Sequence, residues 1–127
     1  MSISITNLTR GNIPYKGLPL SRIAEKVLGK KYELSLVFVG DTRSRTLNKL
    51  YRGKDKPTNI LSFELDENQG EIFINPRIAK KQAPKFGRTY KNFLCFLFIH
   101  GAHHLKGMEH GSTMDKAEEK IQKLFKI

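Results

Sequence analysis

The amino-acid sequence predicts a small α+β (mixed α/β) fold, with about four strands in one sheet and about five helices packed on it. Segments typical of strands alternate along the chain with segments whose apolar residues recur at helical spacing. The length of 127 residues is sufficient for one domain with a real core. No repeat, low-complexity tract or flexible linker interrupts it, so we expect residues 1–127 to form a single domain.

The first part of the chain supplies two expected strands and one helix. Residues 2–8 alternate isoleucine with serine, as an edge strand does. Residues 19–31 place apolar side chains at helical spacing, and Gly29 is the expected stop. Residues 32–40 are β-branched and apolar over a short length, which favours a central strand.

A second helix is expected from Asp41, as its N-cap, to about Arg52. It has an apolar face and a basic face, formed respectively by Leu47, Leu50 and Tyr51, and by Arg45, Lys49 and Arg52. Gly53 and Pro57 mark the following residues as a loop.

The second part of the chain continues the alternation. Residues 59–65 alternate apolar and polar side chains as a half-buried strand does, 66–70 form a turn, and 71–75 are another strand. Pro76 can begin a short helix. An apolar helix is expected from about Thr89 to Lys106, ended by Gly107, and Ser112 with Asp115 resembles a capping pair for a last amphipathic helix.

The charge of the chain points to a polyanionic partner. The formal net charge is +11, from 23 lysines and arginines against 12 acidic residues. The positive charge is concentrated in a first basic segment, residues 43–56, which has one acidic residue, and a second basic segment, residues 76–91, which has none. A solvated basic surface would also give this composition, but two basic segments beside a candidate catalytic site favour nucleic acid.

Other features favour a reduced, cytoplasmic protein without a membrane span. The one cysteine, Cys95, lies in an apolar run and is expected to be a buried thiol. The chain start lacks the pattern of a secretory signal, and the longest apolar run is far below the roughly 20 residues of a transmembrane helix. The oligomeric state is not readable from the sequence.

All four histidines fall within residues 100–110. His100 and His104 are four residues apart and therefore lie on one face of a helix. Gly107 allows the chain to reverse, so that His110 can reach the same point from outside the helix. Three imidazoles with an open fourth position are typical of a catalytic zinc site, which the sequence therefore predicts. Helical geometry alone does not exclude His103 as a metal ligand, but we expect it to lie beside the ligands without binding the metal.

Three stretches, residues 47–63, 70–74 and 100–110, resemble the signatures of the YbeY family of bacterial metal-dependent endoribonucleases. The resemblance implies a single-domain enzyme that acts on RNA in ribosomal RNA maturation and ribosome quality control. It implies zinc ligation by His100, His104 and His110, and a functional role for Arg52.

The chain departs from the family's pattern at three positions. His103 stands where the family usually has leucine, Glu109 replaces the usual aspartate beside the last histidine, and Glu71 replaces another aspartate. Both glutamates keep the negative charge but have a longer side chain than aspartate. Whether either residue supports the metal ligands therefore stays open.

A zinc ion held by three histidines lowers the pKa of its water to about 7. The resulting hydroxide can attack phosphorus or act as a base on the ribose 2′-hydroxyl, and the sequence does not choose between them. We expect Arg52 to clamp the phosphate through its planar guanidinium, with Lys54 as a helper.

Two other functions compete with the endoribonuclease hypothesis. Metalloproteases share this histidine spacing, but they carry a glutamate base directly after the first histidine, and here that position is Gly101. The other alternative is a noncatalytic RNA-binding factor for ribosome assembly with a structural zinc, against which the open coordination position argues.

Overall fold

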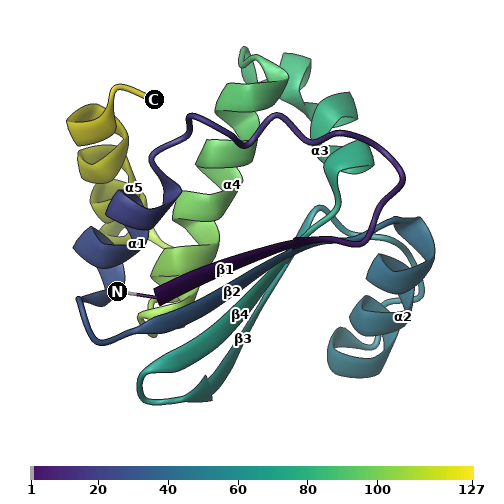
Figure 1. Ribbon diagram of the computed structural model, residues 1–127, viewed down its shortest axis with the longest axis horizontal. Coiled ribbons are helices and arrows are strands. Elements are labelled where there is room, and N and C mark those ends of the chain that lie inside the picture. The colour runs from purple at the N-terminus through teal and green to yellow at the C-terminus, as the bar shows by residue number, and fades with distance from the viewer. Residues whose placement is uncertain (1) are drawn as a thin grey trace.

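The computed structural model describes residues 2–127 and has one four-stranded mixed sheet with the strand order β1-β2-β4-β3 (Figure 1). The strands are β1 (Ser2–Asn7), β2 (Glu33–Phe38), β3 (Ile60–Asp66) and β4 (Gln69–Ile74). β1 and β4 pair with β2 in parallel, and β3 pairs with β4 antiparallel. β1 and β3 are thus the edge strands, as predicted for β1, and β2 is central, also as predicted.

Five α-helices and one 3₁₀-helix, η1, complete the fold, which confirms the predicted class. They are α1 (Leu20–Leu28), α2 (Asp41–Arg52), α3 (Pro76–Gln82), η1 (Ala83–Phe86), α4 (Tyr90–Leu105) and α5 (Ser112–Phe125). Four of the α-helices lie on one side of the sheet, whereas α2 lies toward the other side, near one end of it (Figure 1). None of the helices in residues 2–127 combines the length and apolarity that crossing a membrane requires.

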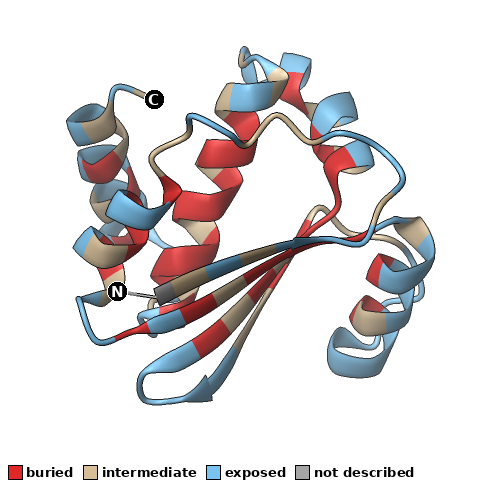
Figure 2. Cartoon of the chain, in the orientation of Figure 1, coloured by how far each residue is buried: buried red, intermediate tan, exposed pale blue. Residues whose placement is uncertain are grey.

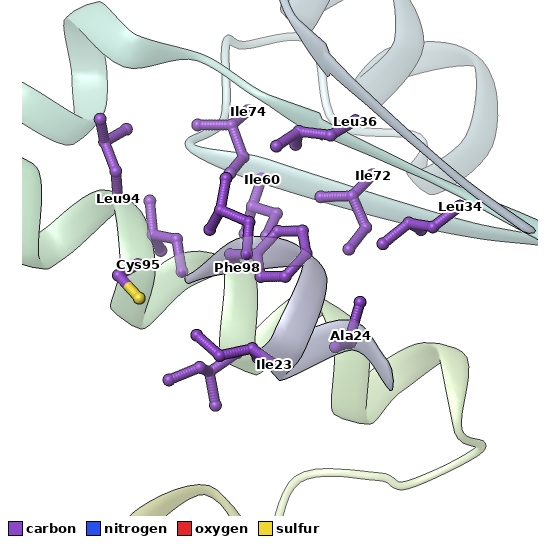
Figure 3. Packing of buried hydrophobic residues seen from close by; sticks show 14 of the residues in the cluster. Ile23, Ala24, Leu34, Leu36, Ile60, Ile72, Ile74, Leu94, Cys95 and Phe98 are labelled. Carbon is purple, nitrogen blue, oxygen red and sulfur yellow. The ribbon is translucent and has the colours of Figure 1, made fainter. Parts of the chain in front are cut away.

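The core lies between the sheet and α4, the most extensively buried helix (Figure 2). Figure 3 shows Phe98 of α4 among Ile72 and Ile74 of the sheet and Ile23 of α1. Cys95 belongs to this cluster, and burial raises the pKa of its thiol to about 11. The expectation of a buried thiol is therefore confirmed. Its raised pKa disfavours the thiolate, which is the form that attacks substrates or binds metals.

Two predicted helix caps are wrong. Gly40 is the N-cap of α2, and Asp41 is its first residue, where its carboxylate accepts hydrogen bonds from Asn75 and Arg77. These contacts link α2 to the start of α3 and lower the pKa of Asp41, chiefly through the hydrogen bond from Arg77. At α5 the N-cap is Gly111 rather than Ser112, and Ser112 is the first residue of the helix.

The apolar face predicted on α2 is not its buried face. Leu50 and Tyr51 are exposed, and the buried residues are Ser44 and Asn48. The Ser44 hydroxyl donates to the carbonyl of Thr58, and the Asn48 amide donates to the carbonyl of Lys56. α2 is thus attached to the loop that follows it through hydrogen bonds, and this attachment fixes the position of its C-terminal end.

The alternation predicted for β3 is present, but Leu61 and Phe63 face away from the helices. Ile60 and Ser62 lie against Gly101 of α4, where a Cβ atom would come within 2.9 Å of both side chains. Because side chains alternate across a strand, Leu61 and Phe63 are on the opposite face of the sheet. There Phe63 packs against Tyr51 of α2, with ring centroids 4.7 Å apart.

Candidate metal centre

The helix α4 places His100 and His104 one turn apart on the same face. α4 ends at Leu105, and Gly107 then adopts a positive φ of 94°, so the chain reverses and brings His110 back. One ring nitrogen from each of these three side chains lies within 4.8 Å of the others. The structure therefore brings together the three residues predicted as ligands, which we call the histidine cluster.

Hydrogen bonds orient the first two rings of the histidine cluster. His104 Nδ1 lies 3.1 Å from the carbonyl oxygen of Met108, and His100 Nδ1 lies 2.5 Å from Oε1 of Glu118. With a proton on each Nδ1, both rings donate to these acceptors and leave Nε2 unprotonated. The two Nε2 atoms are 3.1 Å apart. Two facing lone pairs repel unless a cation lies between them, so the donor set fits a divalent metal such as zinc.

The surroundings of His104 favour the form of this ring that binds metals. The pKa of His104 is lowered, first by burial and then by the charges of His100 and His110. A lowered pKa favours the neutral imidazole, and only the neutral ring has a free lone pair for a metal.

His103 lies apart from this arrangement. Its side chain is buried, and its Nδ1 lies 2.8 Å from the carbonyl oxygen of Ile99, one turn earlier in α4. It is not part of the group of histidines that converge. Glu109, the neighbour of His110, is exposed, and Glu71 lies between Gly70 and Ile72, which face the helices, so its side chain is on the far face of the sheet.

Glu118, which was not predicted from the sequence, also belongs to this site. This residue lies on α5, is buried, and reaches His100 from a segment 18 residues further along the chain. One signal for it was available in the sequence, because Glu118 follows Met114 by four residues and precedes Ile121 by three, which places it on the apolar face of the last amphipathic helix. The structure shows that all three residues are buried. A carboxylate on an apolar face requires a partner, and the nearby histidine supplies one.

Replacing Glu118 with glutamine should weaken metal binding by about 10–100-fold, because the amide does not hold the His100 ring and raise its basicity as a carboxylate does. Competition with a chromogenic chelator measures this affinity. Glu119→Gln is the matched control, since Glu119 is the exposed neighbour on the same helix. Equal affinity of the two variants would contradict a supporting role for Glu118.

A cleft of about 850 Å³ opens beside the histidine cluster. All three histidines and Glu118 line it, together with Arg52, residues 59–64 of β3 and its approach, and aromatic residues of η1 and α4. Arg52 is the last residue of α2, and Gly53 caps the helix with a positive φ of 69°. The predicted phosphate-binding arginine and the histidine cluster thus share one cleft, although 47 residues lie between Arg52 and His100 in the sequence.

Lys54 is placed differently. It is exposed in the loop after α2 and is not among the residues that line the cleft. Its expected role as a helper to Arg52 therefore has no support from the geometry of the cleft, and it stays a prediction.

Gly101 explains why a glutamate after the first histidine does not fit this chain. Its Cα faces the sheet, and a Cβ there would come within 2.9 Å of the ends of Ile60 and Ser62 and 3.2 Å of Ile72. A glutamate side chain at this position would have to push the ends of these side chains aside. The general base of the metalloproteases is absent at this position, and the close packing of Gly101 against the sheet disfavours a side chain there.

Comparison with known proteins agrees with this geometry. The family model described as "Endoribonuclease YbeY" matches residues 18–126. Endoribonuclease YbeY of Geobacter sulfurreducens is 34% identical over 144 residues, covering 100% of this chain and 95% of that protein. Endoribonuclease YbeY of Phytoplasma mali is 36% identical over 118 residues, covering 88% of this chain and 77% of that protein.

A solved structure has the same fold. The solution structure of the protein TM1509 from Thermotoga maritima matches with a TM-score of 0.62 and 27% sequence identity, covering 94% of this chain and 85% of that one. The family model extends over most of the chain, and both relatives exceed 30% identity. The chain belongs to the YbeY endoribonuclease family.

Proposed function

We propose that the protein is a zinc-dependent endoribonuclease of the cytoplasm that prefers single-stranded RNA and acts on ribosomal RNA or ribosomal particles. One observation carries the catalytic part: three histidines converge in a cleft that they share with Arg52. Membership of the family supports RNA as the substrate. The ribosomal role rests on the resemblance of the three sequence motifs to those of the family.

His100, His104 and His110 would hold the metal. When bound, a divalent metal supplies a Lewis acid and makes a nucleophile available near neutral pH. Glu118 and the Met108 carbonyl orient two of the rings, so the lone pairs are already directed before RNA arrives. Arg52 binds the scissile phosphate with its planar guanidinium and neutralises the charge that develops on it.

The products distinguish the two routes of cleavage. Attack by the neighbouring 2′-hydroxyl breaks the bond to the 5′-oxygen and leaves a 2′,3′-cyclic phosphate and a 5′-hydroxyl. Attack by water leaves a linear phosphate monoester on one of the two fragments. End-group analysis of the cut RNA therefore assigns the nucleophile.

One experiment tests the proposed function against both alternatives. The purified protein is incubated separately with RNA and with casein, each with and without a chelator. We expect cleavage of RNA only, and its loss with chelator. Cleavage of casein would support a metalloprotease, and RNA binding without cleavage would support an assembly factor; either result would overturn the proposal.

RNA binding should weaken steeply with salt. Arg77 of the second basic segment pairs at 2.8 Å with Asp41, the first residue of the helix α2 that carries most of the first basic segment. The two segments therefore lie near each other and can contribute to one field. Each phosphate neutralised on a single strand contributes a slope of roughly −0.7 to the dependence of log affinity on log salt concentration. Equilibrium binding between low and moderate salt measures the slope. An affinity that does not change with salt would rule out these segments as the binding surface.

A further inference from the structure

Two exposed aromatic rings are present in the part of the chain that the structure describes, and both line the cleft. In the described residues, six large hydrophobic side chains are mostly exposed: Leu8, Leu50, Tyr51, Leu65, Phe86 and Leu124. Four are leucines, and none of these lines the cleft. Tyr51 and Phe86 are 61% and 56% exposed and both belong to its wall.

Tyr51 is held in place by a stack of rings on the outer face of the sheet. It packs on Phe63 of β3 at 4.7 Å between centroids, and Phe63 packs on Phe73 of β4 at 5.7 Å. One side of the Tyr51 ring therefore rests on the protein while most of its surface stays open to solvent. Tyr51 also directly precedes Arg52, the residue proposed to bind phosphate.

Phe86 is supported in a similar way from η1. Its ring packs on Phe93 and Phe96 of α4, with centroids 5.0 and 6.0 Å apart. Phe96 in turn lies one helical turn before His100 and carries the guanidinium of Arg88 over its ring at 4.3 Å. Phe86 is thus a fixed, exposed ring with positive charge beside it, in the second basic segment.

We propose that Tyr51 and Phe86 are two base-stacking platforms, each of which receives one unpaired base of the RNA that occupies the cleft. Leaving two aromatic rings in water is unfavourable, and rings that are anchored from behind lose little entropy when a base stacks on them. Arg52, which lines the cleft directly after Tyr51, is in place for a phosphate of the same strand. A base has to leave a duplex before it can stack on a protein ring. The platforms therefore give a physical reason for a preference for single strands.

The inference that RNA is the ligand rests on the proposed function, but the test of the two platforms measures binding and does not depend on cleavage. The full-length protein with its metal is titrated with two 2′-O-methyl oligoribonucleotides of equal length, one with bases and one fully abasic, and gels confirm that both stay intact. The ratio of the two dissociation constants measures the contribution of the bases, free of the phosphate contacts common to both.

Stacking of one base typically strengthens binding by about 5- to 150-fold. We expect Tyr51→Ala and Phe86→Ala each to reduce the ratio by a factor in this range, and Tyr51→Phe to keep it. Leu50→Ala is the matched control, because Leu50 is the neighbour of Tyr51 on α2 and is 70% exposed but does not line the cleft. Circular dichroism checks that each variant is folded.

A folded Tyr51→Ala or Phe86→Ala variant with the wild-type ratio would overturn the arrangement of two platforms. A reduced ratio in Leu50→Ala would overturn it as well, because it would show that the effect is not specific to the cleft. Failure of the proposed function is detected separately. A protein that does not cut RNA fails the cleavage test whatever the ratio of the two dissociation constants is.

Discussion

Alanine at His100, His104 or His110 should leave the protein without its metal and reduce RNA cleavage to the level of the chelated wild type. Each substitution removes one of three ligands, and two imidazoles on their own leave a site that cannot compete with water and chelators. Elemental analysis after gel filtration measures metal per chain. We expect about one zinc in the wild type and almost none in these three variants.

His103 provides the control within the same helix. Its Nδ1 is bonded to the backbone of Ile99, so it is not expected to ligate. The family motif at residues 100–110 usually has leucine at this position, so the His103→Leu variant should fold and retain its metal. The His103→Ala variant should also retain most of its metal, although the substitution creates a cavity. A metal-free, folded His103 variant would show that the ligand assignment is wrong.

The sequence predicted the elements and the histidine cluster because both depend on local spacing. Helical periodicity located α1, and a long apolar run located α4. The four-residue separation of His100 and His104 placed them on one face without knowledge of the fold. Gly107 was predicted to end α4 and reverse the chain, and the structure confirms it with a positive φ. Each of these inferences needed only residues close together in the chain.

Features that depend on distant contacts could not be predicted in this way. The buried face of α2 is formed by Ser44 and Asn48 because the carbonyls of the following loop offer them partners, and hydropathy alone favours Leu50. The apolar face of β3 turns outward because α4 packs closely at Gly101 on its other face. Glu118 reaches His100 only after α5 has docked against α4.

Arg52→Ala should reduce single-turnover cleavage at saturating protein by about 10²–10³-fold, with the metal content unchanged. This is the usual effect of removing one preorganised group that stabilises transition-state charge. The structure holds the end of α2 in place, since Gly53 donates to the carbonyls of Asn48 and Lys49 and the Asn48 amide is bonded to the loop. The arginine therefore starts from a fixed backbone, in the wall of the cleft that contains the histidine cluster.

Arg52→Lys and Lys49→Ala separate the phosphate clamp from simple attraction. Lysine keeps the charge but not the planar pair of donors, so we expect Arg52→Lys to remain at least about tenfold slower than the wild type. Lys49 lies outside the cleft, and its ammonium is 3.9 Å from Asp55, so Lys49→Ala should weaken RNA binding modestly, and less at high salt where the field is screened. A saturated complex removes this binding effect, which leaves the rate of the chemical step. If Arg52→Lys holds its metal and cleaves at the wild-type rate, Arg52 is a surface cation and the clamp does not exist.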